Sequence, residues 1–154
     1  MEYFRIQQIK KHLYRIYGVA DEQMYLIEGT EKAVLIDTGC GIGDVKEIVE
    51  SLTDKPVFVL LTHGHVDHAF GAAGFDEIYM NHKDKEVYIR HAKEENARLF
   101  LEMVPDFKEE WMKVKKTVPD VSGLKDLEDG DSFDLGGLHI DAYGCPGHTW
   151  GSMC

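Results

Sequence analysis

Residues 62–68 read Thr-His-Gly-His-Val-Asp-His, and they place three of the chain's eight histidines within six residues. On an α-helix, side chains two residues apart point about 200° away from each other, so His63 and His65 could not bind one ion. In an extended segment, side chains two residues apart share one side, and both imidazoles can converge. The apolar run at residues 57–61 supplies an extended lead-in, and Gly64 allows a tight backbone path. The segment therefore predicts a buried strand that ends in a metal site.

A turn after this strand would bring Asp67 and His68 toward the same cavity from a different angle. Taken alone, Asp67 is typical of a residue that caps a helix beginning at His68. Four imidazole or carboxylate groups within six positions favour metal binding over that structural role. Such ligands suit Zn²⁺ first, with iron, manganese, cobalt or nickel as alternatives. Open α/β sheets usually bind ligands beyond the carboxyl ends of their strands, which is where this segment falls.

The elements expected around this segment change from strands alone to alternating strands and helices. Runs rich in β-branched and aromatic residues predict strands, and apolar stripes at helical spacing predict helices. The predicted strands are residues 4–9, 12–17, 24–28, 33–37, 57–61 and 77–80, and the predicted helices are 42–52, 68–74 and a helical stretch from 83 to about 116. Gly136-Gly137, between further strands at 132–135 and 138–143, indicates a two-residue hairpin. This order predicts an α/β layered architecture with an antiparallel start.

Length and charge exclude several classes of protein. A chain of 154 residues with 44% hydrophobic residues suits one globular domain rather than a disordered tail or a coiled coil. Its net charge of −11 argues against nucleic acid or an anionic membrane as the main partner. The sequence shows no apolar run of membrane-spanning length and no recognisable signal peptide. With three widely spaced cysteines (Cys40, Cys145 and Cys154), these features predict a cytoplasmic protein with free thiols.

Three motifs in the same order give the chain a resemblance to the metallo-β-lactamase-fold hydrolases. Residues 62–68 match the family's H-x-H-x-D-H signature, residues 35–39 (LIDTG) resemble the strand and turn before its first helix, and residues 146–152 (PGHTWGS) resemble its P-G-H-T-x-G-S segment. The resemblance implies an αββα metallo-β-lactamase sandwich, of which residues 1–154 would supply the N-terminal half. The domain would be incomplete at its C-terminus, and residues 83–118 would form a helical insertion or cap. A missing C-terminal half, or a second copy in a homodimer, would complete the sandwich.

The same resemblance implies roles for individual residues. His63, His65 and His148 would hold a first metal ion, while Asp67 and His68 would belong to a second. The implied cofactor is zinc, two ions in the complete site, with iron or manganese as alternatives. A metal-bound hydroxide would attack the substrate, and Asp67 would be the catalytic residue that orients it. Asp37 would support the ligands, or would simply cap a turn.

The implied function is hydrolysis of a small-molecule ester, thioester, lactone or lactam, with hydroxyacylglutathione hydrolase-like enzymes as the nearest relatives expected. Because the ligands of the second half are missing, we expect the 154-residue chain alone to be impaired. Two alternatives stay open: a mononuclear iron oxidoreductase of the same fold, similar to persulfide dioxygenases, and a non-catalytic metal-binding fragment. Asp37-Thr38-Gly39 is also an aspartic-protease signature, but that interpretation requires a dimer and leaves the histidines unexplained.

The remaining candidate residues are interpreted as structural. Histidines without clustered partners are predicted to lie at the surface: His12, His82, His91 and His139. Cys145 is close enough to His148 in the sequence to approach a metal, but we expect a small buried residue there. Trp150 is expected to pack in the interior, and Phe107 with Trp111, four residues apart, to form a packed pair.

Overall fold

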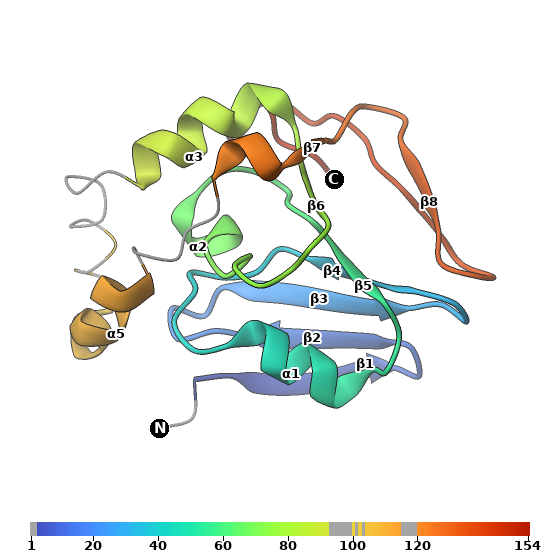
Figure 1. Ribbon diagram of the computed structural model, residues 1–154, viewed down its shortest axis with the longest axis horizontal. Coiled ribbons are helices and arrows are strands. Elements are labelled where there is room, and N and C mark those ends of the chain that lie inside the picture. The colour runs from blue at the N-terminus through green and yellow to red at the C-terminus, as the bar shows by residue number, and fades with distance from the viewer. Residues whose placement is uncertain (1–2, 93–99, 101, 103, 115–119) are drawn as a thin grey trace.

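The computed structural model describes residues 3–92, 100, 102, 104–114 and 120–154, and a mixed sheet of seven strands forms the centre of this part of the chain (Figure 1). The strands lie side by side in sequence order: β1 (Arg5–Lys10), β2 (Leu13–Tyr17), β3 (Gln23–Glu28), β4 (Ala33–Ile36), β5 (Val57–Leu60), β6 (Ile78–Met80) and β7 (Lys125–Asp126).

Connection length decides the direction of each strand. From β1 through β4, short turns join successive strands, and these neighbours pair antiparallel. From β4 through β7, longer crossovers join successive strands, and these neighbours pair parallel. Helix α1 (Val45–Leu52) makes the first crossover, and α2 (Val66–Ala69) follows β5. The Asp44 side chain accepts hydrogen bonds from the backbone N–H groups of Lys46 and Glu47, so α1 begins at residue 45 rather than at the predicted residue 42.

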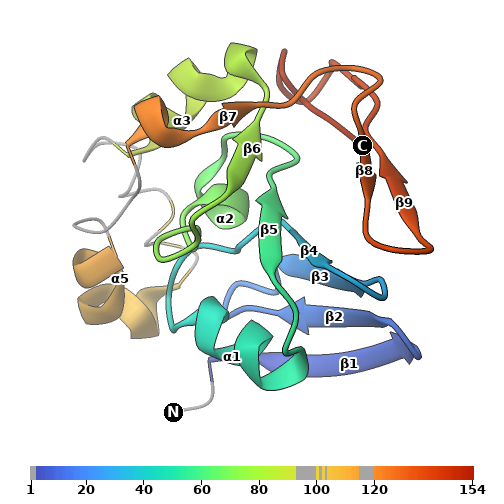
Figure 2. The same cartoon turned by 45° about the vertical axis from the view of Figure 1, so that its right-hand side comes forward.

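Both faces of the sheet carry buried apolar side chains. The sequence of β5 is continuously apolar because its side chains are buried on both faces. On the α1 side, residues such as Leu35, Val49 and Val59 belong to the larger core. A hairpin of β8 (Ser132–Asp134) and β9 (His139–Asp141) covers the other face (Figure 2). A second core lies beneath it, called here the hairpin-side core: Val34, Phe58, Leu60, Leu127, Leu135, Ala142 and Met153.

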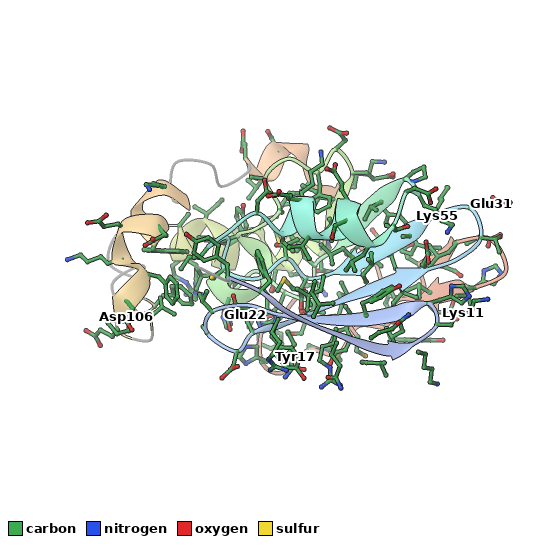
Figure 3. The ribbon with its side chains drawn as sticks, turned by 90° about the horizontal axis from the view of Figure 1, so that it is seen from below. Lys11, Tyr17, Glu22, Glu31, Lys55 and Asp106 are labelled. Atoms are coloured by element: carbon green, nitrogen blue, oxygen red, sulfur yellow. The ribbon has the colours of Figure 1, made fainter. Side chains whose placement is uncertain are left out.

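The face opposite α1 becomes polar toward the first strands. Figure 3 looks at the molecule from below and shows α1 on one side of the sheet and Tyr17 on the other. The guanidinium carbon of Arg5 lies 3.5 Å from the centroid of the Tyr17 ring, and the Arg15 side chain donates a hydrogen bond to the Tyr17 hydroxyl. On this part of the face, over β1 and β2, the side chains make cation–π contacts and hydrogen bonds instead of forming an apolar layer.

The predicted helical stretch 83–118 is helical in its described parts. These are a 3-10 helix at His82–Asp84, α3 (Lys85–His91), a 3-10 helix at Pro105–Phe107 and α5 (Lys108–Val114), while residues 93–99, 101, 103 and 115–119 lie outside the described residues. Trp111 is fully buried and its ring stacks on Phe70, whereas the Phe107 ring contacts Tyr3. Both rings therefore pack, but against different partners among the described residues and not as the predicted pair. No helix in the described part of the chain is both long and apolar enough to cross a membrane.

Most of the predicted elements are confirmed. The six predicted strands before residue 81 match β1 to β6 within about one residue at each end, and the hairpin falls where Gly136-Gly137 predicts it. Both glycines have positive φ angles, 81° and 76°, as the two-residue turn requires. Strand β7 is not predicted from the sequence, because its two exposed charged residues carry no apolar pattern.

Candidate metal centre

The end of β5 positions the histidine segment. β5 ends at Leu60, and beyond bends at residues 62 and 64 the backbone at His65 is extended, with φ and ψ of −73° and 154°. The imidazoles of His63 and His65 consequently lie on one side, with ring centroids 4.7 Å apart. Helix α2 begins at Val66, two residues earlier than predicted, and its single turn redirects Asp67 and His68. The prediction that the imidazoles of His63 and His65 converge is confirmed, although the backbone between them bends at Gly64.

His148 reaches the same place from the other end of the sequence. It lies on the loop after β9, and the backbone N–H of Met153 ties this loop to the carbonyl of Thr62 at 2.9 Å. The Nε2 atom of His148 lies 3.0 Å from Nδ1 of His65. One ring nitrogen from each of His63, His65 and His148 can be chosen so that all lie within 4.8 Å of one another. The structure thus brings together the three residues predicted for the first metal ion.

The donor set fits a divalent metal ion such as zinc. Two imidazole nitrogens on one tetrahedral zinc ion, each at about 2.0–2.1 Å, would lie about 3.3 Å apart, close to the separation seen between His65 and His148. The Nε2 atom of His63 is buried and has no hydrogen-bond partner among the described residues. Since a buried nitrogen without a partner is costly, a bound cation would give this atom its missing contact.

Burial and neighbouring charges favour the unprotonated form of the His63 and His65 rings. Burial lowers the pKa of His63 to about 4, and the neighbouring imidazoles of His68, His65 and His148 add to the effect. Burial also lowers the pKa of His65, with the nearby His91 contributing next. Both rings are therefore neutral at pH 7, which is the form that binds a metal ion.

Asp37 holds His68 by a direct hydrogen bond. Its Oδ2 atom lies 2.8 Å from Nδ1 of His68, and its carboxylate also accepts hydrogen bonds from the backbone N–H and the hydroxyl of Thr62. Burial lowers the pKa of His68, but the hydrogen bond and charge of Asp37, together with the charges of Asp67 and Glu22, outweigh burial, and the pKa is raised overall. The carboxylate binds an imidazole and a hydroxyl group, in keeping with the supporting role that the resemblance implies for it.

Asp67 and His68 form a separate pair beside the three converging histidines. Oδ2 of Asp67 lies 3.5 Å from Nε2 of His68, and the His68 ring centroid lies 4.1 Å from that of His63. The Asp67 side chain is 36% exposed, so part of it is in contact with solvent. Among the described residues, the group of converging ligand atoms contains His63, His65 and His148 but not this pair. Binding of a second ion by Asp67 and His68 stays a prediction.

Two residues near the site, Asp84 and His91, have contacts that were not predicted from the sequence. Asp84 is completely buried and accepts hydrogen bonds from the segments that carry His65 and His148. The prediction that His91 is an isolated surface residue is wrong, because its ring stacks on His65 with centroids 4.5 Å apart. A spacing of four and then three residues separates Asp84, Tyr88 and His91, which places their side chains on one helix face. This spacing could have indicated that Asp84 and His91 face the same site.

Two packing predictions near His148 are also wrong. Trp150 is 82% exposed, and Cys145 is exposed as well. Both lie on the loop after β9, whose described backbone hydrogen bonds are mainly within the loop and to Thr62. Cys145 does not join the converging ligand group within the described part of the chain. The predicted surface positions of His12, His82 and His139 are confirmed, with side chains 49%, 55% and 62% exposed.

Comparison with known proteins adds relatives of stated activity. The family model described as the metallo-beta-lactamase superfamily matches residues 17–154. The acyl-coenzyme A thioesterase MBLAC2 of Homo sapiens is 28% identical over 145 residues, and that of Bos taurus is 30% identical. Each alignment covers 85% of this chain and 52% of the relative. The chain thus spans about half the length of the curated relatives it matches.

Solved structures share the fold. BJP-1, a subclass B3 metallo-beta-lactamase of Bradyrhizobium japonicum, superposes with a TM-score of 0.67 at 22% identity, covering 97% of this chain and 55% of that chain. A Cronobacter sakazakii metallo-beta-lactamase with a HARLDQ motif gives a TM-score of 0.67 at 20% identity, covering 97% and 58%. At this identity the likeness concerns the fold, and it confirms the predicted mixed α/β class.

Proposed function

Because the chain belongs to the metallo-beta-lactamase superfamily, we propose that it carries the metal-binding part of a hydrolase acting on small acyl compounds, thioesters foremost. The observation that carries the proposal is the convergence of His63, His65 and His148, with the buried Nε2 atom of His63 lacking any partner among the described residues. Thioesters come first because the curated relatives include acyl-coenzyme A thioesterases.

His63, His65 and His148 would hold the first ion, zinc by the chemistry of the donor set. A divalent ion bound there would lower the pKa of a water molecule and polarise the carbonyl of the substrate. The chain's own contribution is orientation. Asp37 fixes the His68 ring through one carboxylate oxygen and fixes the start of the histidine segment through its bonds to Thr62.

Asp67 is the residue proposed for proton handling. Its carboxylate is partly exposed and lies beside His68, whose pKa is raised. A carboxylate in this position can accept a hydrogen bond from water and pass a proton to solvent. We propose a second ion on the Asp67–His68 pair, completed by ligands from a second half of the sandwich, and the described helices of the 83–118 stretch as part of a cap.

Metal binding by this chain tests the ligand assignment. We expect His63→Ala to lower zinc affinity at least about 100-fold, because it removes one of three ligands, and the exposed His139→Ala to leave affinity unchanged. Isothermal titration calorimetry with zinc chloride measures both. Equal zinc affinity in wild type and His63→Ala would refute the assignment.

Hydrolysis by the protein expressed from its full coding sequence tests the reaction. We expect acyl-coenzyme A thioester cleavage, detected as free thiol, that disappears with a chelator and returns with zinc. Specific uptake of one iron with no hydrolysis would instead support the iron oxidoreductase, and zinc binding without turnover of any acyl substrate would support a non-catalytic metal-binding module. Either result would overturn the proposed reaction.

A further inference from the structure

We propose that Asp84 is a positioning residue of the metal centre, which sets the distance between the His63–His65 segment and the His148 loop. The inference rests on the proposed function only in taking these three histidines as the metal ligands. Asp84 lies at the end of the 3-10 helix His82–Asp84, directly before α3, and its side chain is completely buried. No ligand histidine contacts it in the described structure, so its effect must pass through the backbone of the two segments.

The carboxylate joins the two segments with three short hydrogen bonds. Its Oδ2 atom accepts the backbone N–H of Gly64 and the hydroxyl of Thr149, each at 2.8 Å. Its Oδ1 atom accepts the backbone N–H of Gly151, also at 2.8 Å. Gly64 lies between His63 and His65, and Thr149 follows His148. One rigid group therefore fixes residues adjacent to all three converging histidines.

Glycine at both contact points shows how close the approach is. A Cβ atom on Gly64 would lie 2.7 Å from the carbonyl oxygen of Asp84 and 2.9 Å from the backbone nitrogen of Tyr88. A Cβ atom on Gly151 would lie 2.6 Å from Oδ1 of Asp84. Any side chain at either position would push the two segments away from Asp84, and with them the histidines.

A carboxylate is the group that this place requires. All three neighbours donate, and an ionised Asp is the small side chain that only accepts. An asparagine of the same shape would turn its NH₂ group toward Gly151 on one side, or toward Gly64 and Thr149 on the other. In either orientation one segment faces a donor instead of an acceptor and must move. The loss would be seen in the ligand geometry even if the fold persisted.

The first test compares Asp84→Asn with Asp126→Asn. Asp126 is a matched control, because it also accepts a backbone N–H in this region, that of His82, but it lies away from the ligands and is partly exposed. We expect Asp84→Asn to lower zinc affinity about 10- to 100-fold in a chelator competition, and to change the absorption spectrum of the cobalt-substituted protein. Asp126→Asn should change neither. Circular dichroism checks that both variants are folded.

A second readout works without metal. In the wild-type apo protein the rings of His65 and His148 are in contact, so a nuclear Overhauser effect between their ring protons is expected. It should weaken or vanish in Asp84→Asn. If wild type binds no zinc yet shows this signal and loses it on substitution, the proposed function fails and the positioning role stands.

A purely structural role predicts a different outcome. Asp84→Asn would then lower the melting temperature but leave the zinc affinity, cobalt spectrum and ring contact of the folded protein unchanged, and this result would overturn the inference. Thr149→Val removes one of the three donors and guards against a variant that fails to fold. We expect it to weaken zinc binding less than Asp84→Asn, and an unchanged affinity together with an unchanged cobalt spectrum would likewise count against the positioning role.

Discussion

The backbone of Asp37 lies in the left-handed region, with φ at 59°, a conformation that residues other than glycine seldom adopt. This turn follows β4 and aims the buried carboxylate at Thr62 and His68. Asp tolerates this region better than most residues, since its short polar side chain forms local hydrogen bonds. The residue with the strained backbone is therefore also the one that orients the His68 imidazole. Backbone strain is often found at functional sites.

Asp37→Asn should lower the pKa of His68. The raised pKa of His68 depends mainly on the hydrogen bond and the negative charge of Asp37, and the amide removes the charge. The imidazole should then lose its proton at a lower pH than in wild type. An NMR titration of the metal-free protein, following the histidine ring signals, measures the change. Asp106→Asn, at an exposed position on another element, should leave the His68 titration where it was; an identical curve for Asp37→Asn would contradict the prediction.

Contacts between elements hold the sheet to its crossover helix. Glu28 at the end of β3 accepts a hydrogen bond from Lys55 at 2.6 Å and one from the hydroxyl of Thr53 at 2.7 Å. Thr53 is the residue that ends α1, and Lys55 precedes β5. The hydrogen bonds from Lys55 and then Thr53 lower the pKa of Glu28. One partly buried carboxylate thus ties three elements together.

Glu28→Gln should destabilise the protein at pH 7 by about 1 to 2 kcal/mol, since charged hydrogen bonds are lost. Because the pKa of Glu28 is lowered on folding, its contribution is present above the unfolded value of about 4.5 and fades as pH falls through the folded value. The difference between variant and wild type should therefore shrink toward pH 3. Urea unfolding at both pH values measures it, with the exposed Glu31→Gln as the control (Figure 3). A pH-independent difference would show that the ion pair is not its source.

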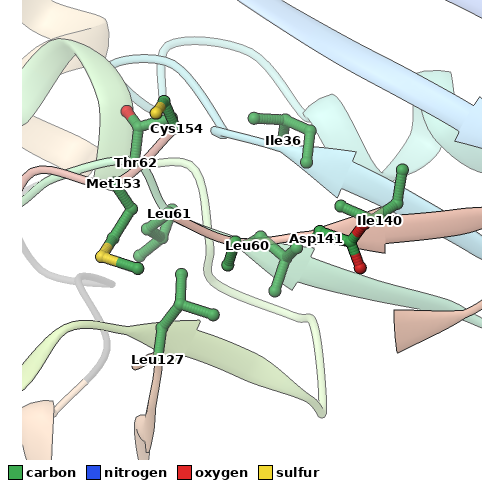
Figure 4. A pocket seen from close by; sticks show the side chains of 10 residues that line it. Ile36, Leu60, Leu61, Thr62, Leu127, Ile140, Asp141, Met153 and Cys154 are labelled. Atoms are coloured by element: carbon green, nitrogen blue, oxygen red, sulfur yellow. The ribbon is translucent and has the colours of Figure 1, made fainter. Parts of the chain in front are cut away.

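In the whole molecule, the candidate metal centre lies where two distant parts of the chain meet. His65 and His148 are 83 residues apart in sequence. Beside their loops an apolar pocket opens on the hairpin side of the sheet, with Leu60, Thr62 and Cys154 among its lining residues (Figure 4). Leu138 and Tyr143, on either side of β9 in the hairpin, are exposed.

Zinc should stabilise the whole fold, because an ion held by both segments binds the native state and not the unfolded chain. At a free zinc concentration of about 100 times the dissociation constant, the gain is about 2.7 kcal/mol. Differential scanning calorimetry should show a rise in melting temperature with zinc and a return to the starting value with EDTA. The rise should be absent in His148→Ala, and a rise of equal size in that variant would place the ion elsewhere.

The sequence alone determined what depends on near neighbours. The period of two in His63 and His65, the apolar run before them and the turn at Gly136-Gly137 each follow from local backbone geometry, and the structure has all three. Family resemblance pointed to His148 as well, although nothing local to that residue shows where its ring lies.

Tertiary structure decided what depends on segments far apart in the chain. The tie through Asp84, the stacking of His91 on His65 and the exposure of Trp150 appear only when α3 and the loop after β9 pack beside the end of β5. The physical reason is that helical and strand periods act over a few residues, whereas burial and hydrogen-bond partners are set by whatever lies opposite in space. The hydrogen bonds of the buried Asp84 can therefore be recognised only in the tertiary structure.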